Sequence, residues 1–288
     1  MNRVATAKTL LMKTFANWSQ DNVPRLAAAF SFYAVLSIAP VLVLAVTVAS
    51  IILTNVNVQE QLFRTVKDFA GGSESVVQLL KDLIKNAQKG GTGTIATIIS
   101  FLVTFFSASN LFLQLQDTVN TIWGIQQRGP MIKQFITTRI LAFVAVAVFG
   151  ALMIAWLGLD SWLSWVARHT PGFDIGPLLS LVGAAAFFTL ALGIAYKGMP
   201  KGRVAWRDVW PGAGIAATGI ALSKLAFSAY FAYANVAAAY GAAGSLVVLL
   251  LWIYYTSQIF FFGLEVTYTY AKEFGSLKGR NPGDLQYS

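Results

Sequence analysis

Residues 26–53 read LAAAFSFYAVLSIAPVLVLAVTVASIIL, an uncharged stretch that directly follows Arg25. A helix needs about 20 predominantly apolar residues to span the hydrocarbon core of a bilayer, and this stretch exceeds that length. It is also too long for the short apolar region of a secretory signal. The stretch therefore predicts an uncleaved first membrane helix, which we expect to tilt in the bilayer or to kink at Pro40.

Similar apolar stretches recur along the chain, which is 56% hydrophobic and only 11% charged. Ordinary soluble domains carry about 25% charged residues, so this composition excludes that class of protein. Together with the first stretch, the apolar segments predict an all-α, polytopic bundle of six transmembrane helices. The predicted spans cover about 27–53, 94–113, 137–159, 177–196, 210–232 and 244–266.

The distribution of basic residues predicts which side of the membrane each loop occupies. Most of the 21 lysines and arginines lie before the first span, between the second and third, between the fourth and fifth, and after the sixth. Loops rich in Lys and Arg stay in the cytoplasm, so we expect both termini there. The predicted organisation is a cytoplasmic segment over 1–26, a transmembrane domain over 27–266 and a cytoplasmic tail over 267–288. The same rule explains the net charge of +9 without a nucleic-acid partner.

The predicted outer loop between the first two spans, about 54–93, contains the pattern of an amphipathic helix. Its sequence SESVVQLLKDLIKNAQKGG begins with Ser73 as the expected N-cap and Glu74 in the first turn, and Lys85 lies near the end. This order of charges suits the helix dipole. Two interpretations stay open: a cap packed over the outer end of the bundle, or a helix at the outer leaflet that guards an entrance.

Small and polar side chains recur at helical spacing within four of the predicted spans. Such faces turn away from lipid, either toward neighbouring helices or toward a water-filled cavity. Lys224 is the strongest indication of a cavity, because a lysine at the bilayer centre costs about 2.5–3.5 kcal/mol on insertion scales. The candidate substrate-contacting residues are Tyr33, Ser37, Thr104, Ser107, Lys224, Ser228, Tyr254, Gln258 and Glu265.

Lys224 and Glu265 are not expected to pair with each other. Lys224 lies about 14 residues, or roughly 21 Å of helical rise, into the fifth span, whereas Glu265 lies near the cytoplasmic end of the sixth. We expect Lys224 to extend outward toward Asp160 or Asp174, or to line an aqueous cavity. Structural anchoring is the alternative to a functional role for both residues.

Four stretches also carry a family resemblance: AAAFSFYAVLSIAP (27–40), LQDTVNTIWGI (115–125), PGAGIAATGIALSKLAFSAYFAYA (211–234) and YGAAGSLVVLLLWIYYTSQIFFFGLEV (240–266). As a combination they resemble the YihY/BrkB family of bacterial membrane proteins, once labelled ribonuclease BN, over about 27–270. The residues that match its pattern are Lys224, Tyr240, Gly241, Trp252, Tyr254, Gly263 and Glu265. Leu264 departs from it, since the family pattern has Ala there.

The resemblance implies a six-helix, multi-pass protein of the bacterial inner membrane. Members of the family are loosely linked to envelope integrity, serum resistance or virulence, and the export of lipid-like or other envelope components. The resemblance brings no settled activity with it.

The polar faces favour a transporter or lipid-handling protein that binds an amphiphilic or anionic envelope substrate among membrane lipids. The alternative is a non-transporting scaffold of the cell envelope, in which the same faces only hold helices together. Oligomeric state stays open, because the small-residue pairs of the fifth span suit contacts within one chain or between chains. These pairs are Gly212 with Ala216 and Gly214 with Thr218.

An enzyme is not expected. The chain has no cysteine and one histidine, and it lacks the phosphate-loop, dinucleotide-binding, zincin and haem-binding motifs. We therefore assign no catalytic residue, metal site or cofactor. Ribonuclease activity is disfavoured because the acidic residues of the predicted cytoplasmic loops are scattered rather than clustered as metal ligands.

Overall fold

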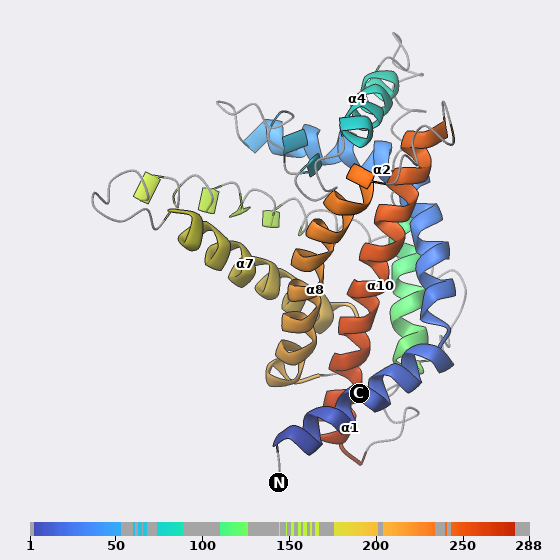
Figure 1. The fold of residues 1–288 in the computed structure, drawn as a ribbon, viewed down its shortest axis with the longest axis vertical. Helices are drawn as coiled ribbons and strands as arrows, with labels where there is room; N and C mark the ends of the chain where they lie inside the picture. Colours follow the sequence, from blue (N-terminus) through green and yellow to red (C-terminus); the bar gives the residue numbers. More distant parts are fainter. Residues whose placement is uncertain are drawn as a thin grey trace.

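The regular structure of the described chain is entirely helical, which confirms the predicted all-α class. The computed structural model describes residues 3–52, 60, 63–64, 66–67, 74–88, 110–125, 144, 148, 151–152, 155–156, 158–159, 162, 165–166, 176–200, 204–233, 240 and 243–279. A helical stretch covers 110–122. The labelled helices in Figure 1 are α1 (Arg3–Gln20), α2 (Val23–Ile52), α4 (Glu74–Gln88), α7 (Gly176–Gly198), α8 (Trp206–Tyr233) and α10 (Gly244–Glu273).

Two helices in the described part of the chain are long and apolar enough to cross a membrane, namely α8 over Trp206–Tyr230 and α10 over its whole length. Shorter apolar helical stretches cover Val23–Ile38 and Val182–Gly198. All four overlap predicted spans, without the same bounds. The count of six stays a prediction, because most of the second and third predicted spans lies outside the described residues.

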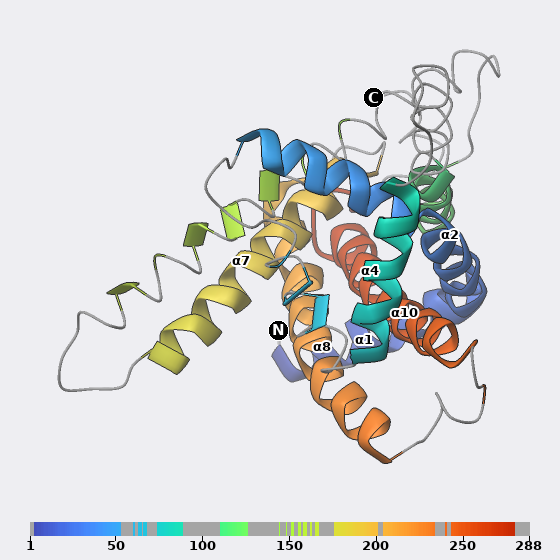
Figure 2. The same cartoon turned by 90° about the horizontal axis from the view of Figure 1, so that it is seen from above.

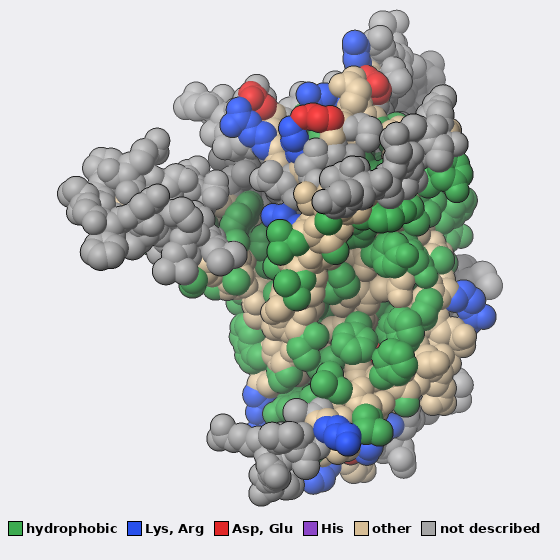
Figure 3. Space-filling model, viewed as in Figure 1, with side chains coloured by type: hydrophobic (Ala, Val, Ile, Leu, Met, Phe, Trp, Pro, Cys, Tyr) green, Lys and Arg blue, Asp and Glu red, His purple; other side chains and the backbone are tan. Residues whose placement is uncertain are grey.

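The surface has the distribution of side chains that a bilayer requires. In Figure 3 hydrophobic side chains cover the middle of the visible face, and charged side chains gather toward its two ends. Large apolar side chains such as Leu222, Leu225 and Leu36 are exposed along the helices. Such residues are stable on the outside of a bundle when lipid rather than water surrounds it.

Helix α10 is the centre of the fold and packs against α8, α2, α1 and α4. It meets α8 at a backbone-to-backbone crossing made by small residues. A Cβ atom added to Gly263 would lie 2.6 Å from the Cβ of Ala216, and one added to Gly212 would collide with the Gly263 carbonyl oxygen. The Gly212–Ala216 pair therefore packs within the chain. Gly214 has open space around its Cβ position.

The ends of the bundle are covered by two helices that lie across it. Helix α1 crosses the end where α10 finishes (Figure 1), and Lys13 of α1 forms a 2.7 Å ion pair with Glu273 of α10. The sequence predicted no helix in 1–26. Because α1 leaves Leu11, Met12 and Phe15 exposed, it has the amphipathic character of a helix at a membrane interface.

Helix α4 lies across the other end, beside α2 and α10 (Figure 2). It forms where the amphipathic pattern predicts a helix, with Glu74 in its first turn and Lys85 in its last. Its apolar face packs in one cluster with α2 and α10, through Val76, Val77 and Leu80. This contact favours the cap interpretation. Ser73 lies outside the described residues, and the side of the membrane that α4 occupies stays a prediction.

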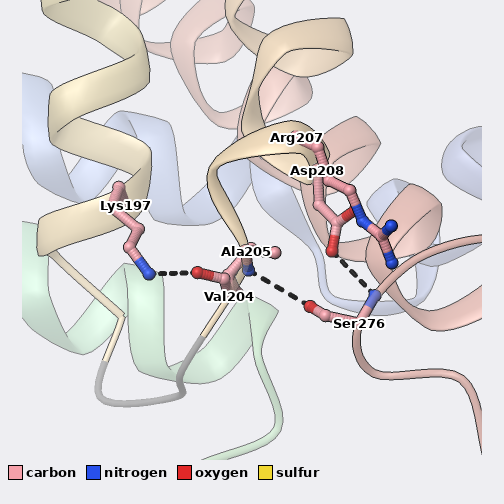
Figure 4. A network of polar contacts seen from close by, with 6 residues as sticks. All are labelled: Lys197, Val204, Ala205, Arg207, Asp208 and Ser276. Carbon is pink, nitrogen blue, oxygen red and sulfur yellow. Dashed lines mark hydrogen bonds and ion pairs between the residues drawn. The ribbon is translucent and has the colours of Figure 1, made fainter.

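A polar network joins the start of α8 to the chain that follows α10 (Figure 4). The Ser276 N–H donates to Asp208 Oδ2 over 2.8 Å, and the Ala205 N–H donates to Ser276 Oγ over 3.2 Å. Lys197 Nζ, at the end of α7, donates to the Val204 carbonyl. These bonds hold the ends of α7, α8 and α10 together.

Candidate functional site

Two acidic side chains, Asp21 and Glu265, meet at the α1 end of the bundle. Glu265 belongs to a continuous buried stretch of α10, from Gly263 to Thr269, and is 0% exposed. Asp21 lies in the two-residue turn between α1 and α2. We refer to these two residues as the carboxyl pair.

The turn that places Asp21 has a clear local cause. Asn22 ends α1 with a φ of 52°, a left-handed conformation that Asn adopts more readily than most residues. Pro24 occupies the first turn of α2, where its missing N–H leaves no helical hydrogen bond unmade. The chain therefore bends sharply at Asp21 and Asn22, from α1 across the end of the bundle into α2 alongside α10 (Figure 1).

The two carboxyl groups lie within hydrogen-bonding reach of each other. Neither oxygen of Glu265 receives a hydrogen bond from an N–H or hydroxyl donor. Two ionised carboxylates are acceptors only and cannot bond to each other. The contact is favourable only when one member of the pair carries a proton, so that its O–H donates to the other.

Burial favours the protonated state of the pair. It raises the pKa of Asp21 above the usual value, and the hydrogen bond with Glu265 partly opposes that shift. In the described part of the chain neither carboxyl forms an ion pair with a Lys or Arg. An unpaired buried charge costs several kcal/mol, so a second negative charge at this site is strongly disfavoured.

Other buried polar side chains lie on α1 and α10 near this end of the bundle. Asn17 Nδ2 of α1 donates to Thr269 Oγ1 of α10 over 3.2 Å. Thr14, one turn earlier on α1, is fully buried, and its hydroxyl oxygen has no partner. The face that α1 turns toward α10 is therefore polar, although it lies in the interior of the protein.

The helical stretch 110–122 and the turn after it add further buried polar groups, among them those of Gln116, Asn120 and Trp123. Asn120 is 2% exposed, and neither its Oδ1 nor its Nδ2 has a partner. The Trp123 ring lies 5.3 Å from the ring of Tyr268 on α10. Asn120 comes one turn before Trp123, and Glu265 comes one turn before Tyr268. The predicted topology runs both helices inward, so we expect Asn120 at the depth of Glu265.

The structure places the sequence-predicted site residues at different parts of the bundle. Glu265 and Ser37 are buried, Tyr33 and Ser228 are exposed, and Lys224 is half-buried and engaged with a neighbour. Tyr254 and Gln258 are half-buried on α10. Thr104 and Ser107 lie outside the described residues. Position 40 lies within α2, but the side chain of Pro40 is not described, so the kink stays a prediction.

Asp21 is the site residue that sequence reasoning missed. A usable signal was present, because Asp21 immediately precedes the inner end of the first predicted span and Glu265 lies at the inner end of the sixth. Two acids at one membrane depth have few alternatives to facing each other or water. Among the described residues, no three His, Cys, Asp or Glu side chains gather in a way that could hold a metal ion.

A pocket of about 470 Å³ opens at the α4 end. It is lined by Glu60, Phe63, Arg64, Lys67, Glu74, Val77 and Lys81. We refer to it as the α4 pocket. Its walls carry both signs of charge, since Arg64 pairs with Glu60 at 2.7 Å and Lys67 pairs with Glu74. The Lys81 ammonium lies 5.5 Å from the centre of the Phe63 ring.

Comparison with known proteins places the chain in a family. The model of the family described as virulence factor BrkB matches residues 14–284. A UPF0761 membrane protein of Ralstonia nicotianae is 27% identical over 87% of this chain and 56% of its own length. A UPF0761 membrane protein of Alteromonas mediterranea is 27% identical over 91% of this chain and 87% of its own.

The chain spans about half the length of several of the curated relatives that it matches, the Ralstonia protein among them. No solved structure gives a significant match. The family match covers nearly the whole chain, including the last two turns of α1, the stretch 110–125 and α10. The chain therefore belongs to the BrkB family and is a UPF0761-type membrane protein.

Proposed function

We propose that the protein transports or otherwise handles an amphiphilic envelope lipid, whose head group binds in the α4 pocket. This proposal is supported by one observation: the α4 pocket, whose walls carry both signs of charge, adjoins an apolar cluster. Phe63 and Val77 belong both to the pocket wall and to the cluster that joins α4 to α2 and α10. A polar head and apolar chains would each find a matching surface there.

The charges of the pocket suit a head group that contains a phosphate and an amine. Arg64, Lys67 and Lys81 supply donors for phosphate oxygens, which bind such cations by charge-assisted hydrogen bonds. Glu60 and Glu74 supply acceptors for an ammonium group. The existing ion pairs are solvent-exposed, and such pairs contribute little to stability. A head group can therefore displace them at little cost.

The residues singled out in the sequence extend this proposal along the bundle. Lys224, half-buried on α8, would meet the anionic part of the substrate at membrane depth, next to the polar face of Tyr254 and Gln258 on α10. A substitution Lys224→Ala is expected to slow transfer while the protein still inserts and folds.

A scaffold role is the second candidate, and the α4 contact favours it. Val76, Val77 and Leu80 are buried against the bundle, so α4 already has a structural task without any ligand. In that case the exposed charges of α4 would bind another envelope component and no lipid would move.

Transfer of lipid between leaflets by the purified protein distinguishes the two candidates. Liposomes containing the protein and a trace of head-group-labelled phospholipid are treated with a quencher that reaches only the outer leaflet. We expect protein-dependent transfer that Lys81→Ala lowers by about tenfold, the equivalent of 1.4 kcal/mol and within the range of a charge-assisted hydrogen bond.

Lys85→Ala is the matched control, because Lys85 is exposed on the same helix and does not line the pocket. It should leave the transfer rate unchanged. Transfer that is absent from wild-type liposomes would support the scaffold role. Equal loss in both variants would show that the α4 pocket does not bind the head group of the transferred lipid.

A further inference from the structure

We propose that Asp21 and Glu265 form a proton-binding site that fastens the α1–α2 turn to α10 and releases it when the proton leaves. The inference concerns the α1 end of the bundle and does not depend on the lipid pocket at the α4 end. It stands on the contact between two carboxyl groups, the complete burial of Glu265 and the absence of any donor to its oxygens within the described chain.

The proton balance of the site is simple. In the fastened state one carboxyl O–H donates to an oxygen of the other carboxylate, and the pair carries one negative charge. When that proton passes to water, the O–H···O bond is lost and the pair carries two negative charges. Like charges at hydrogen-bonding distance in a buried site repel strongly, so the turn moves away from α10.

The charged groups on the surrounding elements do not compensate the second charge. On α1 and α10, Lys13 and Glu273 pair with each other, and Lys272 lies over the Tyr268 ring. Arg25 of α2 and Asp117 of the stretch 110–122 are exposed. Among the described groups, no Lys or Arg therefore neutralises a second negative charge on the carboxyl pair, and a bound proton prevents that charge from forming.

Unpartnered polar atoms on α1, within the stretch 110–122 and directly after it indicate what the released state gains. Thr14 Oγ1, Asn120 Oδ1, Asn120 Nδ2 and Trp123 Nε1 are buried without hydrogen bonds in the fastened state. Water that enters when α1 moves would satisfy such groups. The Asn17–Thr269 hydrogen bond and the exposed Lys13–Glu273 ion pair are among the described contacts that would still link α1 to α10.

Infrared spectroscopy of the purified protein tests the bound proton directly. We expect the carbonyl-stretch band of a protonated carboxylic acid near neutral pH, lost in both Glu265→Gln and Asp21→Asn. Glu273→Gln, which changes the exposed ion pair nearby, should keep the band. Absence of the band from the wild-type protein would overturn the proposal. Two single variants are used so that a failure of one to fold does not end the test.

Thiol labelling tests the release of α1, since the chain has no cysteine of its own. Thr14→Cys reports the buried face of α1 and Ala16→Cys, at an exposed position, corrects for the intrinsic pH dependence of thiol reactivity. The ratio of their labelling rates should rise by up to about tenfold per pH unit across the titration, as release of one proton requires. Adding Glu265→Gln should keep the ratio low at every pH.

A ratio that does not change with pH would contradict the release. A ratio that responds to added sodium chloride at fixed pH, without a protonated-acid band, would assign the site to a metal cation and would also reject the proposal. Neither measurement requires lipid transfer, so its outcome is independent of the proposed function.

Discussion

Gly212 of α8 and Gly263 of α10 touch backbone to backbone, and no side chain separates the two helices at that point. Within membranes, helix association depends on such close approach because lipid is as apolar as the side chains themselves. The contact lies two residues from Glu265, so the same crossing that joins the helices also holds one member of the carboxyl pair in place.

Gly263→Ala should destabilise the protein by about 1–3 kcal/mol, the usual range for overpacking a tight interior. The added Cβ would lie 2.6 Å from the Cβ of Ala216 and 2.5 Å from the Tyr196 hydroxyl. Thermal unfolding in detergent measures the effect. Gly214→Ala is the control, because nothing lies within 4 Å of its Cβ position. It should be neutral or slightly stabilising, since Ala favours helix over Gly.

Tyr196→Phe should lower stability by about 0.5–1.5 kcal/mol, the net value of a typical hydrogen bond. The buried Tyr196 hydroxyl donates to the Phe260 carbonyl over 2.6 Å and thereby ties α7 to α10. Tyr255→Phe removes a hydroxyl from an exposed tyrosine on α10 and should have a smaller effect on the melting temperature. Equal effects of the two substitutions would show that the α7–α10 bond contributes little.

The parts of this fold that sequence could predict are those that depend on local pattern. Apolar length located α2, α8 and α10, and amphipathic spacing together with end charges located α4. Glu265 could be identified because a carboxylate within an apolar membrane helix is energetically costly and therefore indicates a specific role. Each of these signals is contained in one continuous segment.

The parts that sequence could not predict depend on contacts between distant segments. Asp21 and Glu265 belong to opposite ends of the chain, and the sequence around neither residue indicates that the two are in contact. Gly212 suits packing within a chain as well as between chains, and only the position of Gly263 decides. Helix α1 was missed because its exposed apolar residues, such as Met12 and Phe15, do not form the long apolar stretch of a span.

Asp208→Ala should destabilise the junction between α8 and the chain after α10. Its carboxylate is fully buried and accepts the Ser276 N–H, and an unpaired buried donor costs about 1–3 kcal/mol. Proteolysis near Ser276 and the melting temperature in detergent report the loss. Asp208→Asn keeps an oxygen acceptor and should recover most of the stability. If the two variants were equally unstable, the negative charge, and not the hydrogen bond, would be the important feature.

Asp21 should make the stability of the protein depend on pH, with a sign that follows from its environment. Burial raises the pKa of Asp21 above its usual value, so the native state holds this proton more tightly than the unfolded chain does. The stability contributed by the bound proton is complete below the pKa of an unfolded aspartate, about 4. It is lost as the pH rises toward the raised native pKa, because unfolding then releases a proton.

Melting temperatures in detergent across that range should therefore fall with rising pH in the wild-type protein and fall less steeply in Asp21→Asn. The asparagine cannot ionise, and its side-chain N–H can donate to the Glu265 carboxylate. Glu273→Gln alters an exposed ion pair and should keep the wild-type slope. An unchanged slope in Asp21→Asn would place the titrating group elsewhere in the chain and would leave Asp21 as a plain turn residue.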